Sequence, residues 1–167
     1  HYLVFQEILD PSEPAAEYMQ DYNTDIFMKR NVASAQPYYS RHTWIHLVRG
    51  EVNSFLKAYY NCMAAQADRE TYTFPEGIQR AVRAIKKESP HKTHEEGWFL
   101  LETRWMLYME RGKTLRFLPG VPRAWLAHGQ SIKLEQVATY FGKASLTVES
   151  SSNDGVIRAV VECTSDR

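Results

Sequence analysis

The pattern of apolar and polar positions predicts helices over the first part of the chain. The strongest segment follows Gly50, where six apolar side chains recur at the spacing of one helix face: Val52, Phe55, Leu56, Tyr59, Tyr60 and Met63. A similar but weaker periodicity predicts helices over residues 15–30, 41–48 and 78–87. We therefore expect a series of helices that bury one face against their neighbours.

Residues 94–110 carry the densest apolar run. Its large side chains cover nearly every direction around a helix: Trp98, Phe99, Leu100, Leu101, Trp105, Met106, Leu107, Tyr108 and Met109. Such a helix is typically buried on most sides, as in the inner layer of a large bundle. A chain of 167 residues is short for surrounding it. The chain also begins at His1 rather than at a methionine, and it stops just after a strand-like run. For these reasons we interpret the chain as a fragment.

After Gly112 the pattern changes from helical to alternating, which predicts strands. Pro122 can open a short helical turn over 123–126. The alternation predicts strands around 114–118, 132–134 and 144–148. Asn153-Asp154-Gly155 then predicts a hairpin turn, followed by a strand over 156–163 with Ile157, Ala159 and Val161 on one face. The predicted fold class is thus α+β, with a helical segment over 1–111 and antiparallel strands over 112–167.

Composition narrows the classes of partner. The chain is 44% hydrophobic and 24% charged, which is usual for a globular protein. Its 20 basic and 20 acidic residues cancel and form no extended basic patch, so a nucleic-acid partner is not predicted. No apolar run reaches the roughly 20 residues that span a bilayer. Cys62 and Cys163 suit no metal or redox motif, and we expect two buried free thiols.

Four stretches resemble the last part of bacterial six-hairpin glycosidase-like proteins: RETYTF (69–74), PHKTHEEGWF (90–99), LRFLPGVPRAWL (115–126) and YFG (140–142). The likeness covers roughly residues 31–161. It implies an (α/α)6 toroid of helical hairpins followed by an antiparallel β-sandwich. Six hairpins need twelve helices, and this sequence predicts only four or five. The resemblance therefore implies the tail of a longer parent protein, which would work outside the cytoplasm by analogy with enzymes of this kind.

The resemblance implies a carbohydrate substrate, and glycoside hydrolysis needs two carboxyl groups across the scissile bond. Four glutamates are candidates: Glu70, Glu76, Glu95 and Glu96. Glu70 directly follows a strong helix, where toroid loops would line the mouth of a cleft. Thr93 and Glu96 have the spacing of a capping box, so we interpret Glu96 as a structural residue. For Glu70 and Glu95, the catalytic and structural interpretations both stay open.

Further side chains are candidates for substrate contact: Arg69, Tyr72, His94, Trp98, Tyr38 and Tyr39. A flat aromatic ring can stack on the apolar face of a pyranose, although core packing is the rival interpretation for Trp98. Neither His91 with His94 nor His42 with His46 has the further ligands of a zinc site, so we predict no metal and no cofactor.

The leading hypothesis is therefore a fragment of a glycoside hydrolase, with Glu70 and Glu95 as the catalytic candidates. A polysaccharide lyase on the same toroid is the second hypothesis, with Tyr72 or His94 as base and Arg69 neutralising a uronate. A binding or structural module that kept the fold and lost the chemistry is the third. The expected partners are a carbohydrate and the remainder of the parent polypeptide. We expect the fragment alone to be inactive, because half a toroid cannot close a cleft.

Overall fold

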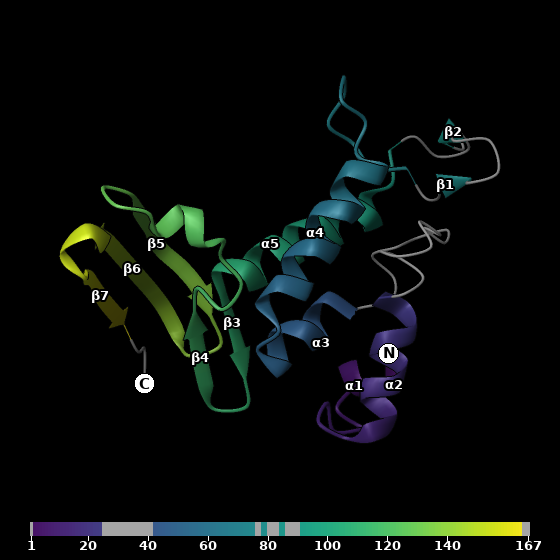
Figure 1. Ribbon diagram of the computed structural model, residues 1–167, viewed down its shortest axis with the longest axis horizontal. Coiled ribbons are helices and arrows are strands. Elements are labelled where there is room, and N and C mark those ends of the chain that lie inside the picture. The colour runs from purple at the N-terminus through teal and green to yellow at the C-terminus, as the bar shows by residue number, and fades with distance from the viewer. Residues whose placement is uncertain (1, 25–41, 76–77, 80–83, 86–90, 165–167) are drawn as a thin grey trace. The chain divides into compact units, whose positions relative to one another are not determined.

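A computed structural model describes residues 2–24, 42–75, 78–79, 84–85 and 91–164. The described residues form helices and antiparallel strands, which confirms the mixed α+β class (Figure 1). The chain divides into two compact units, His1–Met106 and Leu107–Arg167. The division falls before the predicted boundary near residues 111–113, because residues 108–111 form a strand that pairs with the next one.

The described part of the first unit is mainly helical. Its helices are α1 (Tyr2–Phe5), α2 (Pro14–Thr24), α3 (His42–Arg49), α4 (Val52–Gln66) and α5 (Thr93–Leu107), the last of which ends one residue beyond the unit. The predicted helices over 41–48 and after Gly50 are confirmed as α3 and α4. Residues 25–30 of the helix predicted over 15–30 lie outside the described residues.

A glycine turn joins α3 to α4. Gly50 has a φ of +76°, its N–H donates to the Leu47 carbonyl, and the Glu51 N–H donates to the His46 carbonyl. These two bonds form a Schellman motif, which satisfies the last carbonyls of a helix and needs a residue that tolerates positive φ. The turn brings the apolar faces of the two helices together, with Ile45 and Phe55 fully buried.

Helix α5 differs from its prediction in two ways. It ends at Leu107 rather than Glu110, because Tyr108–Arg111 forms strand β3. It is also buried on one side only: Glu95, Glu102, Trp105 and Met106 are buried, whereas Leu100 is 66% exposed. The expectation of burial on most sides is therefore wrong for this chain. Apolar side chains all around a helix indicate that each face can be buried, but the pattern does not say which faces have a partner to pack against.

The predicted helix over 78–87 is also wrong where the chain is described. Ile78–Gln79 (β1) and Ala84–Ile85 (β2) are short antiparallel strands, with Ile78 opposite Ile85. Both isoleucines are β-branched, which favours a strand over a helix.

The second unit is built from antiparallel strands. They are β3 (Tyr108–Arg111), β4 (Thr114–Phe117), β5 (Ser131–Thr139), β6 (Gly142–Ser151) and β7 (Val156–Thr164). Strands β3 and β4 form a hairpin, and the other three form a sheet in the order β5-β6-β7. A 3₁₀ helix, Arg123–Leu126, confirms the predicted helical turn, and Gly155, with a φ of +70°, confirms the predicted turn before β7.

The core of this unit lies on one face of the sheet. Leu134, Leu146 and Val148 are buried there, and partly buried apolar residues pack against them, among them Tyr108 and Phe117. The pairing of β5 with β6 is irregular between Leu134 and Val137, where Gln136 has a φ of +50° and its N–H donates to Ser145 Oγ. This irregularity is a β-bulge, which bends the strand locally.

Both cysteines are free thiols, as expected, but they differ in exposure. Cys62 is buried in α4, and Cys163 is exposed on β7. The expectation that Cys163 is buried is wrong, because β7 is the outer strand of its sheet and all its residues are exposed.

Candidate functional site

The loop after α4 carries three of the predicted site residues. Its turn is held by the Asp68 carboxylate, whose Oδ1 accepts the N–H groups of Glu70 and Thr71 at 2.9 Å each. The Asp68 backbone adds two bonds, because its N–H donates to the Thr73 carbonyl and its carbonyl accepts the Tyr72 N–H, both at 2.9 Å. Residues 68–73 therefore form a compact, internally bonded turn.

Hydrogen bonds from the Thr71 and Glu70 N–H groups lower the pKa of Asp68 below its usual value. The carboxylate thus stays ionised to a lower pH than an unbonded aspartate. This protects the turn, since an ionised carboxylate is the better acceptor for both N–H groups.

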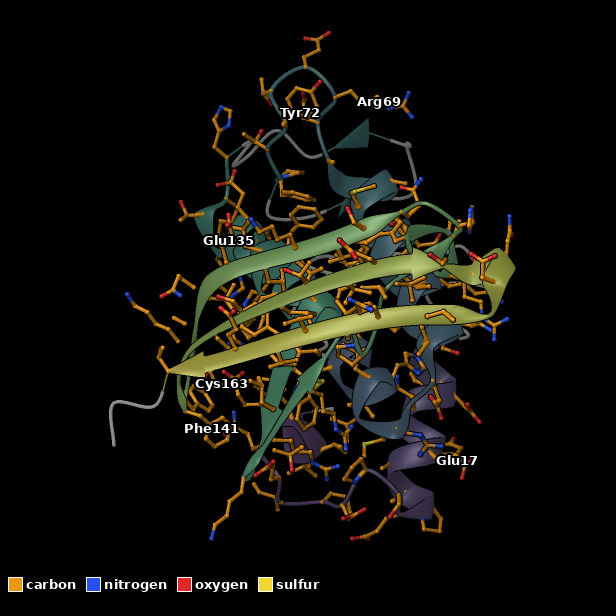
Figure 2. The ribbon with its side chains drawn as sticks, turned by 90° about the vertical axis from the view of Figure 1, so that its left-hand side faces the viewer. Glu17, Arg69, Tyr72, Glu135, Phe141 and Cys163 are labelled. Atoms are coloured by element: carbon orange, nitrogen blue, oxygen red, sulfur yellow. The ribbon has the colours of Figure 1, made fainter. Side chains whose placement is uncertain are left out.

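The same turn exposes the candidate residues to solvent. Arg69 and Glu70 are exposed, and the Tyr72 side chain is 83% exposed (Figure 2). Tyr72 has a φ of +56°, a conformation that a non-glycine residue adopts at an energetic cost. Strained residues of this kind cluster at ligand-binding sites when the surrounding bonds hold them in place. The sequence analysis named these three residues but not Asp68. An aspartate side chain that bonds the backbone about two residues further along the chain is a known turn signal.

The start of α5 lies against this loop. The Lys92 N–H donates to the Phe74 carbonyl at 2.8 Å, and the rings of Phe74 and Phe99 lie 4.9 Å apart between centroids. Phe74 and Cys62 form a buried cluster, with Trp98 and Phe99 packed against it. The structure therefore brings the two predicted groups, residues 69–72 and 94–98, to the same end of the α4–α5 pair.

His94 bonds through both ring nitrogens. Trp98 Nε1 donates to His94 Nε2 at 3.0 Å, and His94 Nδ1 lies 3.2 Å from Glu95 Oε1. Because Trp98 is only a donor, Nε2 acts as acceptor and the proton of a neutral ring is on Nδ1, from which it donates to the carboxylate. His94 is therefore held in one orientation and is not placed to act as a base through a free nitrogen.

Glu95 and Trp98 are placed for structural contacts. Glu95 has no exposed surface, and the Trp98 ring packs against the rings of Phe5 and Trp105 at 6.1 and 6.2 Å. These ring contacts are consistent with core packing, the rival interpretation for Trp98, and its contact with a substrate stays a prediction. The capping box is also displaced, since the Glu96 N–H bonds to the Lys92 carbonyl and makes Lys92, rather than Thr93, the N-cap. Tyr38, Tyr39 and Glu76 lie outside the described residues.

A buried polar group near the middle of α5 was missed by sequence reasoning. Glu102 is 2% exposed and accepts a hydrogen bond from Thr43 Oγ1 at 2.6 Å, and the hydroxyls of Tyr59 and Thr103 lie 2.8 Å apart. Burial raises the pKa of the Cys62 thiol well above its usual value, and the carboxylates of Glu102 and Glu95 add to this. The seven-residue spacing of Glu95 and Glu102 was a signal that both lie on one face of the helix.

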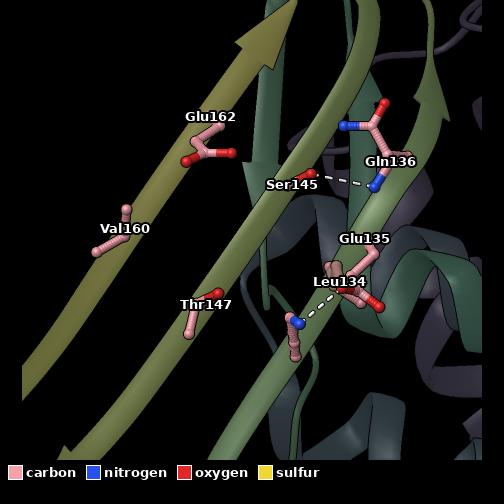
Figure 3. A pocket seen from close by; sticks show the side chains of 8 residues that line it. Leu134, Glu135, Gln136, Ser145, Thr147, Val160 and Glu162 are labelled. Carbon is pink, nitrogen blue, oxygen red and sulfur yellow. Dashed lines mark hydrogen bonds and ion pairs between the residues drawn. The ribbon is translucent and has the colours of Figure 1, made fainter.

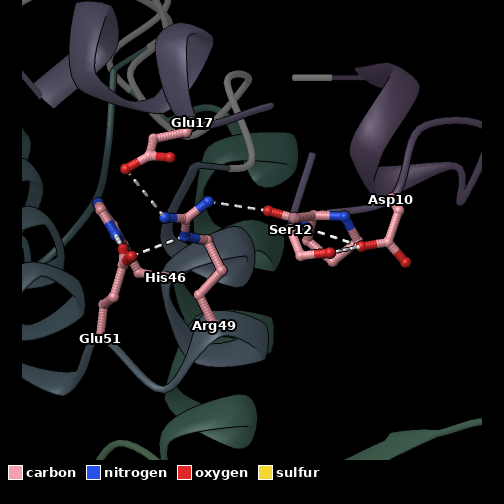
Figure 4. Close-up of polar contacts among 7 residues, drawn as sticks. Asp10, Ser12, Glu17, His46, Arg49 and Glu51 are labelled. Atoms are coloured by element: carbon pink, nitrogen blue, oxygen red, sulfur yellow. Dashed lines mark hydrogen bonds and ion pairs between the residues drawn. The ribbon is translucent and has the colours of Figure 1, made fainter. Parts of the chain in front are cut away.

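Arg49 holds the Schellman turn to the segment before α2, and His46 bonds Glu51 within the turn. His46 Nδ1 and Arg49 Nε bond the two Glu51 oxygens at 2.6 Å each, and Arg49 also donates to the Pro11 carbonyl at 2.9 Å (Figure 4). Arg49 lies 3.8 Å from Glu17 as well. Because His46 is 3% exposed and bonded to Glu51, we interpret it as a structural residue. Among the described residues, no group of three or more His, Cys, Asp or Glu side chains could hold a metal ion.

The His46 cluster predicts a loss of stability in acid. Burial lowers the pKa of His46, although the hydrogen bond and charge of Glu51 oppose this. The unfolded chain then takes up a proton near pH 6.5 that the folded chain does not, so the free energy of unfolding falls below that pH by up to about 1.4 kcal/mol per pH unit. Burial of Glu51 raises its pKa, but bonds from Arg49 and His46 outweigh this and lower it, which extends the loss below pH 4.5.

Urea unfolding at pH 7 and pH 5.5 measures this effect. In His46→Gln, the amide can still donate to Glu51 but does not titrate, so the fall in stability between the two pH values is expected to be smaller than in the wild type. An equal fall in both proteins would show that His46 is not its source.

A shallow hollow of about 350 Å³ lies on the polar face of the β5-β6-β7 sheet (Figure 3). It is lined by Lys133, Leu134, Glu135, Gln136, Ser145, Thr147, Val160 and Glu162. Lys133 and Glu135 form an ion pair at 2.6 Å. The lining contains none of the predicted site residues and no aromatic ring for a sugar to stack on, so we do not place the site here.

No helix in the described ranges is long and apolar enough to cross a membrane. Comparison of the chain with protein-family models, with curated proteins and with solved structures found no match in any of the three.

Proposed function

We propose that this chain is part of a carbohydrate-active enzyme, a glycoside hydrolase whose (α/α)6 toroid is followed by a β-sandwich. The resemblance of residues 69–74, 90–99, 115–126 and 140–142 to six-hairpin glycosidase-like proteins supports this proposal. So does the order of the elements, because the α3–α4 hairpin and α5 precede antiparallel strands.

One observation carries the proposal. The turn over residues 68–73 is fixed by four hydrogen bonds of Asp68, three that it accepts and one that it donates, yet it exposes Glu70 between Arg69 and the strained Tyr72. A carboxylate, a guanidinium and a phenol on one rigid turn supply groups that sugar chemistry uses. The carboxylate can activate water or attack the sugar, the guanidinium can bond hydroxyls, and the ring can stack on a pyranose.

In this proposal Glu70 is one of the two carboxyl groups that hydrolysis requires. Its exposed position suits the ionised partner, which acts as base or nucleophile, and the proton donor comes from another hairpin of the parent enzyme. Glu95 does not touch the sugar, because it is fully buried. Its role is to hold His94 in place through the Nδ1 bond, next to the loop that carries Glu70.

Polysaccharide lysis is the second candidate. It needs a base next to a uronate and a cation to neutralise the acid, and Tyr72 and Arg69 lie on the same exposed turn. His94 is the weaker base of the two, since both of its ring nitrogens are bonded. The third candidate is a glycan-binding module that lacks chemistry.

Product analysis of the parent protein separates the three. We expect new reducing ends from a polysaccharide without an increase in ultraviolet absorbance, because hydrolysis leaves saturated sugars. Reducing ends that appear together with ultraviolet absorbance would contradict hydrolysis and support the lyase. Retention of the protein by a polysaccharide gel, without any new reducing ends, would support the binding module and contradict both enzymes.

A further inference from the structure

A side chain that can change its charge lies between two partners at the start of α5. His94 accepts a hydrogen bond from Trp98 Nε1 at its Nε2, at 3.0 Å, and its Nδ1 lies 3.2 Å from Glu95 Oε1. Histidine is the side chain that ordinarily gains and loses its proton between about pH 5 and pH 8. The two contacts are not equally stable in the two protonation states of the ring.

Only the neutral ring can make both bonds. A neutral imidazole has one N–H group and one acceptor nitrogen, whereas both nitrogens of an imidazolium are donors. The Trp98 indole is a donor as well and has no acceptor atom. Protonation of His94 therefore places two N–H groups against each other at 3.0 Å, which is a repulsive contact. Turning the ring over does not restore the bond, because each nitrogen of the cation carries a proton.

Packing holds Trp98 in place, so His94 is the partner that moves. The Trp98 ring lies 6.1 Å from the Phe5 ring and 6.2 Å from the Trp105 ring between centroids. It also packs against the buried cluster that contains Phe74. A displaced Trp98 ring would lose these contacts, whereas the His94 side chain, which is 36% exposed, reaches solvent by rotation about its own bonds.

Neighbouring groups affect the pH at which this change occurs, but not its direction. The buried Glu95 carboxylate favours a positive charge on the ring, and the N-terminus of α5, where His94 is the second residue, opposes it. On α4, burial raises the pKa of the Cys62 thiol well above its usual value, so this group stays neutral. His91 is exposed in the segment before α5, where its charge acts on Asp68.

We propose that the His94–Trp98 bond is a pH-sensitive contact, which fixes the start of α5 when His94 is neutral and opens when His94 is protonated. This end of α5 is also bonded to the loop after α4, since the Lys92 N–H donates to the Phe74 carbonyl. Acid therefore loosens α5 at the end that contacts this loop. The bond lies within the chain and involves no substrate, so it is independent of the proposed function.

The indole N–H signal of Trp98 in a nitrogen–proton NMR spectrum of the 167-residue chain reports this bond directly. Between about pH 8 and pH 5, the signal is expected to move from the position of a bonded N–H group toward that of a free one. Trp98→Phe identifies the signal among those of the four tryptophans. Trp125, which is 40% exposed in the other unit, provides a reference signal.

Two substitutions of His94 reproduce the two states of the bond. In His94→Gln, the side-chain oxygen can accept from Trp98 but does not titrate, so the signal is expected to keep the bonded position at both pH values. His94→Ala has no acceptor, so the signal is expected to have the free position at both. His91→Gln is the matched control, because it removes an exposed histidine three residues away and is expected to leave the wild-type response unchanged.

Exchange of the Trp98 indole proton with deuterium measures the size of the effect. At about pH 5 the wild type is expected to exchange at least about tenfold faster than His94→Gln, because its bond is open, and at about pH 8 the two rates are expected to be similar. A wild-type Trp98 signal that does not change with pH would overturn the proposal. So would a change that His94→Gln retains or that His91→Gln removes.

Discussion

Glu70→Gln in the parent protein is expected to lower the turnover of a polysaccharide by about a hundredfold or more under the proposed function. Glutamine keeps the size of the side chain but cannot take up a proton or attack a sugar, and a positioned acid–base group typically contributes 10²–10⁴-fold to the rate. The substitution does not disturb the turn, because Glu70 bonds Asp68 through its backbone N–H. Turnover is measured from reducing ends at saturating substrate.

Two further variants make this result specific. Glu135→Gln removes an exposed carboxylate on β5 and is expected to leave turnover unchanged. Glu95→Gln keeps an acceptor for His94 Nδ1, so a loss much smaller than that of Glu70→Gln is expected. If Glu70→Gln retains the wild-type rate, Glu70 is not a catalytic residue and the proposed site is wrong.

Phe55→Ala is expected to reduce the free energy of unfolding of the helical unit by about 3–5 kcal/mol. Phe55 has no exposed surface and its ring stacks on Tyr59 at 5.9 Å, so truncation loses both the buried area and the ring contact. The loss is a large part of the stability of an ordinary domain. Urea unfolding followed by the helical circular dichroism signal measures it.

Phe141→Ala provides the comparison for the same type of substitution. Phe141 is 43% exposed in the turn between β5 and β6, and its removal is expected to leave the helical transition unchanged. A loss for Phe55→Ala below about 1 kcal/mol would show that the α3–α4 pair does not form the core described.

The elements that were predicted correctly are those whose local signals agree. The apolar stripe of α4 and the glycine before it specify the same helix start, and Asn153-Asp154-Gly155 specifies the turn before β7. The predictions failed where the pattern suits two structures. Tyr108 and Met109 continue the apolar run of α5, but both also fit a strand, and pairing with Phe117 and Arg116 decides between the two.

The site was predictable in part for the same reason. Exposure of Arg69, Glu70 and Tyr72 follows from their place after a helix that ends near Gln66. The burial of Glu95 could not be predicted, because it depends on what packs against α5 and not on the spacing along it. The two bonds of His94 likewise depend on side-chain geometry, although the i, i+4 spacing of His94 and Trp98 allows one of them.

The unequal burial of the two thiols places one chemical reporter in each unit. Alkylating reagents attack thiolates, so Cys62, buried and with a raised pKa, is shielded in the folded chain, whereas Cys163 is accessible. Modification of Cys62 thus requires the helices to open. The rate of Cys62 modification therefore records the opening of the helical unit, with the accessible Cys163 as a reference thiol in the same chain and no label introduced.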